Sequence, residues 1–393
     1  MKQKKILIVF MVQAFIFNLT NVITPGYLNS LGVEKYYFGY FAAFWSLGML
    51  ISSPVWGALG DLYGRKKFAI LGLIIYGLSQ LVFFYSSNVA ILSVMRIVSG
   101  IGVGAPVTLL LSHMIGSVSR SETGKYLALR MGFLTVGSTV AYKVSGYLGL
   151  VYQKELFLVQ SLLSIFLIFI VIILIKEKKE PHCVLPKQFN MFSSIKHLKL
   201  LSKDNIIFLV SITLTTMTFV NIDKFIDLYV IDSGYDSLML GNLKMVFGIL
   251  TIIINLVVLP KMKKYLGSVY ILQSIQIFMA IIALIVFSDS RLIIMLYTLF
   301  LLYVVLRAIF TTSEQLFLAS KVSRKDMGLF MGLRQSFTCL GMVVGPIIGG
   351  HIYQTEPRNL FIFSVVCLLL SSTFLAYIQN DIKDYKQKNY VKA

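Results

Sequence analysis

Long apolar runs alternate with short polar segments along the whole chain. Each run holds about 20 residues, the length that an α-helix needs to cross a bilayer. A membrane β-barrel would show apolar and polar residues alternating over about ten positions, whereas the runs here are continuous. The pattern predicts an all-α membrane protein with twelve transmembrane helices. The predicted spans are 6–28, 37–59, 68–86, 89–117, 125–150, 155–175, 205–231, 238–260, 268–287, 292–319, 328–353 and 359–379.

Composition agrees with this pattern. Charged residues make up 13% of the chain, whereas a soluble domain has about a quarter. The N-terminal MKQKKILIVF resembles a secretory signal, but its apolar run is too long and no small-residue cleavage site follows. We therefore interpret it as the start of the first span.

The net charge of +19 is explained by the distribution of Lys and Arg between the two sides of the membrane. Lys and Arg gather at both termini and in every second segment between spans, and the intervening loops hold only four: Lys35, Lys154, Arg291 and Arg358. The positive-inside rule then predicts that both termini are cytoplasmic. We expect this basic face to contact anionic lipid rather than nucleic acid.

The two halves of the chain resemble each other. VSRSETGKYLALRMGFLTVG (118–137) matches VSRKDMGLFMGLRQSFTCLG (322–341) at an offset of 204, and YLNSLG (27–32) matches YVIDSG (229–234) at an offset of 202. A duplicated six-helix unit in the same orientation is the layout of transporters that rock two bundles around a central site.

The repeat predicts two six-helix bundles in residues 1–175 and 204–393. A basic cytoplasmic loop, 176–203, joins them. Its part from 189 to 201 has the pattern of a short amphipathic helix on the inner membrane surface.

A distinctive basic loop, GALGDLYGRKK (57–67), separates the second and third spans. Taken alone it is an ordinary loop that obeys the positive-inside rule. It resembles the signature loop of the major facilitator superfamily, G-x-L-x-D-x-x-G-R-K, which it matches with Gly57, Leu59, Asp61, Gly64, Arg65 and Lys66. The resemblance covers the whole chain and implies a two-bundle transporter. The equivalent loop of the second half, PKMKKYLG (260–267), lacks the aspartate.

The fourth span contains RIVSGIGVGAP (96–106). Arg96 and Gly100 resemble the span-4 pattern of drug exporters of this family, in which the arginine takes part in proton coupling. No strand precedes the three glycines, so we expect them to serve helix packing and not nucleotide binding.

Span 11 contains GMVVGPIIGG (341–350), which resembles the antiporter motif of the drug–proton exporters through Gly341, Gly345, Pro346, Gly349 and Gly350. That motif normally lies in span 5. Span 5 here carries the aligned but degenerate GSTVAYKVSG (137–146), in which Lys143 aligns with Ile347 of span 11. The span-11 motif is either the antiporter feature or a surface for helix packing.

The spans contain ionisable residues, which are rare inside a bilayer and often functional. The best candidates for binding protons are Asp223 and Asp227, which are i,i+4 and share a helix face, and Glu314. Asp223 aligns with Asn21 in the repeat. A carboxylate can take up and release a proton as its exposure to water alternates. The alternative is a local ion pair between Lys224 and one aspartate.

The cations Lys143 and Arg307 have no obvious partner in the sequence. Either they favour an anionic or zwitterionic substrate, or they pair with the acidic residues, and Lys143 can also reach the outer interface by snorkelling. Lys244 either snorkels or meets Asp232 or Asp236.

The family resemblance also implies a cytoplasmic latch in the state that is closed to the inside. Asp61 would pair with Arg334, and Glu122 with Arg65.

No phosphate-binding loop of the form G-x-x-x-x-G-K-[ST] occurs. The three cysteines and four histidines are scattered, so no metal site is expected. We expect no enzyme and no cofactor, with a proton gradient as the energy source.

The expected function is proton-coupled efflux of a small amphipathic compound by a monomer in the plasma membrane. The alternatives are export of one anionic metabolite, such as a carboxylate siderophore or a sugar derivative, and uptake by proton symport. A non-transporting scaffold or sensor is disfavoured by the intact signature loop.

Overall fold

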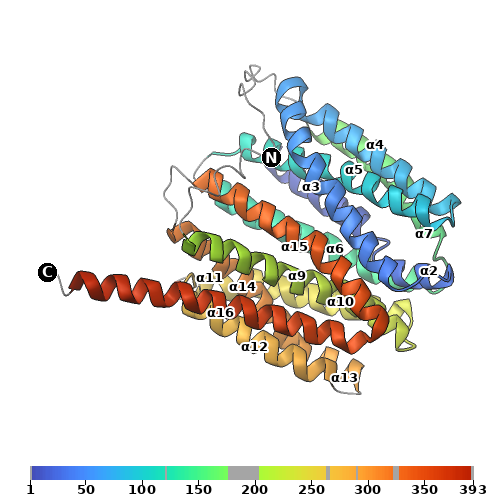
Figure 1. The fold of residues 1–393 in the computed structure, drawn as a ribbon. Coiled ribbons are helices and arrows are strands. Elements are labelled where there is room, and N and C mark those ends of the chain that lie inside the picture. The colour runs from blue at the N-terminus through green and yellow to red at the C-terminus, as the bar shows by residue number, and fades with distance from the viewer. Residues whose placement is uncertain are drawn as a thin grey trace. The chain divides into compact units, whose positions relative to one another are not determined.

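The computed structural model describes residues 2–119, 122–175, 203–262, 266–288, 291–321 and 327–390. In these ranges all regular elements are helices (Figure 1). They are α1 (Lys2–Asn18), α2 (Thr24–Ser30), α3 (Tyr36–Tyr63), α4 (Arg65–Tyr85), α5 (Val89–Ser117), α6 (Thr123–Leu148), α7 (Glu155–Leu174), α9 (Lys203–Asp232), α10 (Ser237–Ile253), the π-helical turn η2 (Ile254–Val258), α11 (Leu259–Met262), α12 (Val269–Ser288), α13 (Leu292–Tyr297), α14 (Leu299–Lys321), α15 (Met327–Thr355) and α16 (Pro357–Tyr390). The predicted amphipathic helix at 189–201 and the loop 176–202 lie outside the described residues.

Ten helices in the described ranges are long and apolar enough to cross a membrane. They correspond to ten of the predicted spans. The predicted span 6–28 is broken between α1 and α2, and α1 is shorter than the others. The predicted span 125–150 is the 26-residue helix α6. Its charges and its many Gly, Ser and Thr residues lower its hydropathy. The protein is therefore a multi-pass helical membrane protein, and the count of twelve spans in two repeated bundles stays a prediction.

The helices form two compact units. The first unit comprises Met1–Phe189 and Ile226–Ile252, and the second comprises Asn190–Phe225 and Ile253–Ala393. The helix α9 is continuous across the boundary at Phe225. The division into bundles 1–175 and 204–393 concerns the repeat in the sequence, and it stays a prediction.

In the first unit α5 packs against both α3 and α4, and these helices lie side by side (Figure 1). The glycines of the fourth predicted span allow the approach. A Cβ added to Gly100 would lie 2.1 Å from the carbonyl oxygen of Trp45 on α3, and one added to Gly102 would lie 2.6 Å from the backbone nitrogen of Tyr76 on α4. The G-x-G-x-G segment therefore serves helix packing, as predicted.

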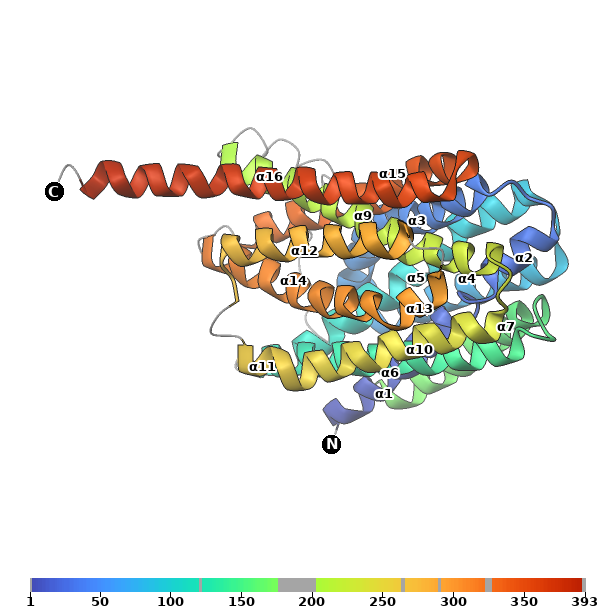
Figure 2. The same ribbon diagram turned by 90° about the horizontal axis from the view of Figure 1, so that it is seen from below.

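In the second unit α12 packs against α14 and α16 (Figure 2). The span-11 motif lies on α15, where its glycines contact α9. A Cβ added to Gly341 would lie 2.7 Å from the carbonyl oxygen of Thr213, and one added to Gly345 would lie 3.0 Å from the Cα atom of Met217. Gly349 is equally close to Asn221, at 2.7 Å from its Oδ1 atom. The motif thus brings two helices into backbone contact.

Candidate transport site

The signature loop turns sharply between α3 and α4. Gly64 has a φ of 109°, a conformation that favours glycine. The Asp61 carboxylate pairs with Arg65 one helical turn later, with 2.9 Å between Oδ1 and Nη2, and the Asp61 side chain is 51% exposed. Such i,i+4 pairs form readily on one helix face. The turn at Gly64 and the i,i+4 spacing therefore hold the aspartate and arginine of this loop together at the surface.

Two basic side chains of this loop also bind carbonyl oxygens of neighbouring helices. Arg65 donates to the carbonyl oxygen of Ser112 on α5 at 3.2 Å, and Lys66 donates to that of Ile172 on α7 at 2.8 Å. Ile172 lies in the last turn of α7, where a cation satisfies a free carbonyl and interacts favourably with the helix dipole. These hydrogen bonds therefore connect the start of α4 to α5 and to the last turn of α7.

The latch residues have other partners in this structure. Arg65 pairs with Asp61, and Glu122 accepts a hydrogen bond from the Ser119 hydroxyl at 3.0 Å, so the predicted pair of Arg65 and Glu122 is not formed among the described residues. Asp61 precedes Arg65 by four residues, whereas Glu122 is distant from Arg65 in the sequence. The predicted pair of Asp61 and Arg334 in the state closed to the inside stays a prediction.

Arg96 lies near the start of α5 among aromatic rings. Its guanidinium is 5.1 Å from the centre of the Phe83 ring and 5.7 Å from that of Phe41, and Nη2 donates to the Thr24 hydroxyl at 3.5 Å. Cation–π contacts of this kind stabilise a partly desolvated arginine. No ion pair of the described residues includes Arg96.

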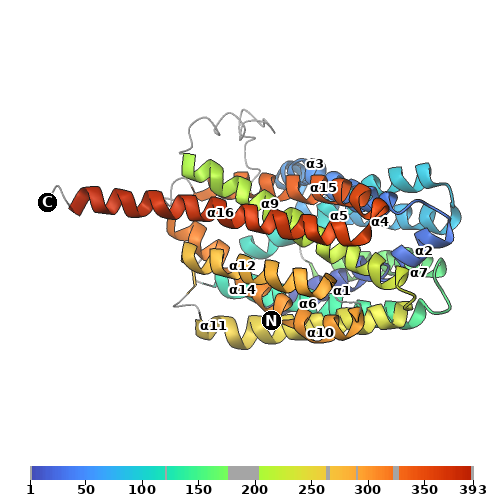
Figure 3. The same ribbon diagram turned by 60° about the horizontal axis from the view of Figure 1, so that its bottom comes forward.

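The helices α6 and α10 both belong to the first unit and lie side by side (Figure 3). Lys143 lies in the tight seam between them. A Cβ added to Gly146 would lie 2.8 Å from the Cα atom of Gly241, so the two backbones touch. The Ser237 hydroxyl donates to the carbonyl oxygen of Gly146 at 3.1 Å, and the Lys143 ammonium donates to the Asn242 side-chain oxygen. Lys143 thus binds a neutral amide, whereas the sequence predicted a substrate anion, a carboxylate or snorkelling.

Lys244 pairs with Asp227, which corrects both partners predicted for it. Its Nζ atom lies 2.6 Å from Asp227 Oδ1, and the two side chains are 15% and 3% exposed. The predicted partners are engaged elsewhere. Asp232 pairs with Lys35 at 2.7 Å, and Asp236 accepts from the backbone N–H of Met239 at the start of α10.

Asp223 forms a bidentate pair with Arg307 in the second unit. Nη2 of Arg307 lies 2.6 Å from Oδ2, and Nη1 binds Oδ1. The side chains of Arg307 and Asp223 are 31% and 42% exposed. The Arg307 guanidinium also lies 4.8 Å from the centre of the Phe219 ring. This is the pairing with an acidic residue that the sequence left open for Arg307.

Glu314 and Arg334 form a second bidentate pair in that unit. The two donor–acceptor distances are 2.8 and 3.1 Å, and the side chains are 8% and 17% exposed. The bidentate geometry and the burial make this the more enclosed of the second unit's two carboxylate–arginine pairs. The sequence named both residues but assigned Arg334 to the latch.

A neutral polar network surrounds Asn21 in the first unit. Asn21 donates to Asn18 at 2.8 Å, and the Tyr142 hydroxyl donates to the same Asn18 oxygen at 3.1 Å. The Tyr142 ring lies 5.8 Å from the Lys244 ammonium. Sequence reasoning missed Asn18 and Asn242. The sequence did indicate Gly241, the glycine that contacts Gly146, because it aligns with Gly39 in the repeat.

Comparison with known proteins decides the family. The model of the Major Facilitator Superfamily matches residues 6–313 and, in a second match, residues 266–392. The chain belongs to the Major Facilitator Superfamily. It is therefore a membrane transporter of small molecules and not an enzyme.

Individual relatives are named as drug-resistance proteins. Multidrug resistance protein 2 of Bacillus subtilis is 23% identical over 379 residues, covering 92% of each chain. Quinolone resistance protein NorA of Staphylococcus aureus is 24% identical over 343 residues, covering 85% of each. The crystal structure of a D-xylose–proton symporter superposes with a TM-score of 0.75 at 13% identity, over 94% of this chain and 96% of that chain, and supports the fold. The resemblance to drug exporters of this family is thus confirmed.

Proposed function

We propose that this protein exports a small amphipathic compound from the cell in exchange for protons, by alternating access. The observation that carries the proposal is the bidentate pair of Asp223 and Arg307. It lies within membrane-spanning helices, yet both of its side chains keep partial exposure. A proton and the guanidinium compete for the same carboxylate, so uptake of a proton by Asp223 would release Arg307.

The other carboxylate–base pairs extend this scheme. Glu314 with Arg334 and Asp227 with Lys244 are more enclosed. When such an ion pair separates, a charge is left without its partner, and an unpaired charge in a low-dielectric site has a high free-energy cost. Protonation of the carboxylate and a change of conformation are therefore linked, and one equilibrium between inward-open and outward-open states can be biased by both proton and substrate.

The names of the relatives support an amphipathic drug-like compound as substrate. We further propose that the protein works as a monomer in the plasma membrane with both termini cytoplasmic, that its inner face contacts anionic lipid, and that it uses the proton gradient without a cofactor. A reporter that is active only in the cytoplasm, fused to the C-terminus, tests the orientation.

The deciding experiment uses the purified protein in liposomes with an imposed pH gradient. A panel of cationic, neutral and anionic compounds is added, and proton movement is followed with a pH-sensitive dye inside the vesicles. We expect substrate-linked proton movement in the wild type, and its loss in Asp223→Asn with substrate binding retained. Full coupling in both Asp223→Asn and Glu314→Gln would overturn the proposal.

Export of one defined anionic compound is the second candidate. Its support is that the ion pairs of the described residues include none of Arg96, Arg130 and Lys143, so the first unit carries cations without carboxylate partners. The Lys143→Gln variant separates the two candidates, because glutamine keeps a hydrogen-bond donor for Asn242 and removes the charge. Loss of transport for anionic but not cationic compounds would favour the second candidate.

A further inference from the structure

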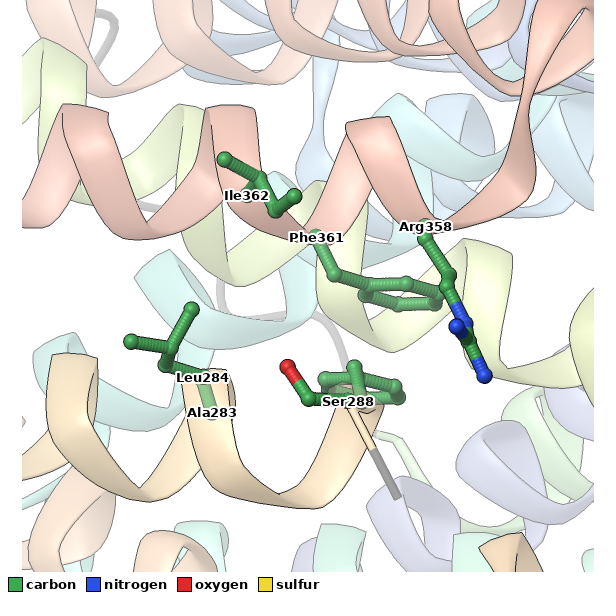
Figure 4. A pocket seen from close by; sticks show the side chains of 7 residues that line it. Ala283, Leu284, Ser288, Arg358, Phe361 and Ile362 are labelled. Carbon is green, nitrogen blue, oxygen red and sulfur yellow. The ribbon is translucent and has the colours of Figure 1, made fainter. Parts of the chain in front are cut away.

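A groove of 190 Å³ opens between the end of α12 and the start of α16, within the second unit. Its lining residues are Ala283, Leu284, Phe287, Ser288, Arg358, Phe361 and Ile362. Figure 4 shows Phe361 between Ile362 and Arg358 along α16, with Leu284 and Ser288 on the facing helix. The rings of Phe287 and Phe361 stack with 3.6 Å between their centroids. The groove is thus lined by two stacked aromatic rings, and its polar lining residues are Arg358 and Ser288.

An exposed apolar stripe continues from the groove along each helix. On α16 it consists of Ile362, Val366, Leu369 and Leu370, which follow Arg358 at helical spacing and are each 42–48% exposed. From Arg358 to Leu370 the helix rises by about 18 Å. One leaflet of the hydrocarbon core is about 15 Å thick. The stripe therefore has the length of a lipid tail that begins at the membrane surface.

The facing helix repeats this arrangement. On α12 the exposed apolar residues include Leu284, Ile281 and Phe278, and both Ser288 and Arg358 line the groove. Each helix therefore has a polar side chain near one end of an exposed apolar track. A small apolar ligand would be bound by the groove alone and would make no use of the apolar tracks. A free anion would be bound by Arg358 alone and would make no use of the apolar groove.

The positive charge of Arg358 favours a lipid with an anionic head group. Arg358 is exposed and has no ion pair or side-chain hydrogen bond among the described residues, and Glu356, two positions earlier, does not pair with it. A guanidinium binds a phosphate through two parallel hydrogen bonds. A second donor, the Ser288 hydroxyl, lines the same groove.

We propose that this groove binds one anionic phospholipid, with the phosphate on Arg358 and Ser288 and an acyl chain along the α12–α16 tracks. The charge distribution of the chain assigns Arg358 to the outer face, so the lipid belongs to the outer leaflet. The lining of the groove includes no residue of the pairs Asp223–Arg307 and Glu314–Arg334, and the proposal does not depend on the transported compound.

The test measures lipid binding to the purified full-length protein by native mass spectrometry. The probes are phosphatidylglycerol, phosphatidylcholine with the same chains, and glycerol 3-phosphate. We expect the first phosphatidylglycerol to bind about tenfold more weakly to Arg358→Gln, with recovery in Arg358→Lys. Lys154→Gln is the matched control, since it removes another cation of the predicted outer loops without touching the groove. Ile362→Ser should weaken binding severalfold, whereas Ile173→Ser, an exposed apolar position on α7, should not.

Three results would overturn the proposal. The first is equal binding of phosphatidylglycerol to the wild type and Arg358→Gln. The second is equal binding of phosphatidylcholine and phosphatidylglycerol to the wild type. The third is displacement of the lipid by glycerol 3-phosphate at equal concentration, which would mean that the groove and its tracks add nothing.

Discussion

The helices α6 and α15 are related by the sequence repeat, and each packs a glycine-rich face on another helix of its own unit. A Cβ on Gly137 would meet the carbonyl oxygen of Met11 at 2.1 Å, and one on Gly341 would meet that of Thr213 at 2.7 Å. These contacts correspond under the same offsets that relate the two halves of the sequence. The backbone packing of the two helices is therefore alike.

Their charged side chains are not alike. Arg334 on α15 forms its bidentate pair with Glu314, whereas the aligned Arg130 on α6 lies 4.8 Å from the centre of the Phe10 ring. Asp223 likewise aligns with the neutral Asn21. Duplicated helices can thus share packing while the titratable groups gather in one copy, since packing depends on small residues and proton binding depends on single carboxylates.

The largest difference is expected between the aligned arginines. Arg334→Ala leaves Glu314 buried and unpaired, and removing one partner of a buried pair costs about 3–5 kcal/mol. Arg130→Ala removes a cation–π contact worth about 1 kcal/mol. Unfolding in detergent, followed by circular dichroism, measures both. The double variant Arg334→Ala with Glu314→Gln should recover part of the loss. Equal destabilisation by the two single variants would remove the asymmetry.

The shared glycine contacts should give the next largest effect. Gly137→Ala and Gly341→Ala each insert a methyl group against backbone atoms, and overpacking of this kind costs about 1–3 kcal/mol. Gly137→Ala should be the worse of the two because its contact is closer. Gly132→Ala and Gly332→Ala are controls on the same helices, since nothing lies within 4 Å of either added Cβ. A control that destabilises as much as its partner would show a general intolerance of these helices.

Lys143 distinguishes α6 from α15, where Ile347 stands at the aligned position. Lys143→Met should destabilise by about 1 kcal/mol because Asn242 loses its hydrogen-bond donor. Lys143→Gln should lose less, since its amide can donate to Asn242. Thermal unfolding of the three proteins side by side checks the order. Equal stability of the wild type and Lys143→Met would mean that the hydrogen bond does not strengthen the α6–α10 seam.

The smallest stability effect is expected at Asp61, whose side chain is mostly in solvent. An exposed ion pair contributes about 0–1 kcal/mol, so Asp61→Asn should unfold almost like the wild type. If Asp61 acts in the latch, the same variant should still lose transport in liposomes. Normal transport by a stable Asp61→Asn variant would contradict the latch with Arg334.

The sequence predicted the features that depend on local spacing. Apolar runs of span length predicted where the membrane-length helices lie, although the predicted span 292–319 is divided into α13 and α14 and α16 extends past its span to Tyr390. Glycine spacing in RIVSGIGVGAP predicted a packing surface. The break between α1 and α2 was not predicted, because the span 6–28 was drawn through Asn18, Thr20 and Asn21, the polar residues that stand at the break. The polar helix α6 was predicted as a span, although its hydropathy is lower than that of the ten apolar helices.

The sequence by itself determined a helical membrane protein, its signature loop and the family to which it belongs. It also named the charged residues inside the spans. Only the tertiary structure decided their partners: Lys244 binds Asp227, Arg307 binds Asp223, and Lys143 binds a neutral amide. The physical reason is that a partner on another helix depends on the rotation and depth of both helices. Close contacts such as that of Gly146 with Gly241 determine the rotation and depth of each helix. These contacts join residues far apart in the sequence, so no local sequence pattern predicts them.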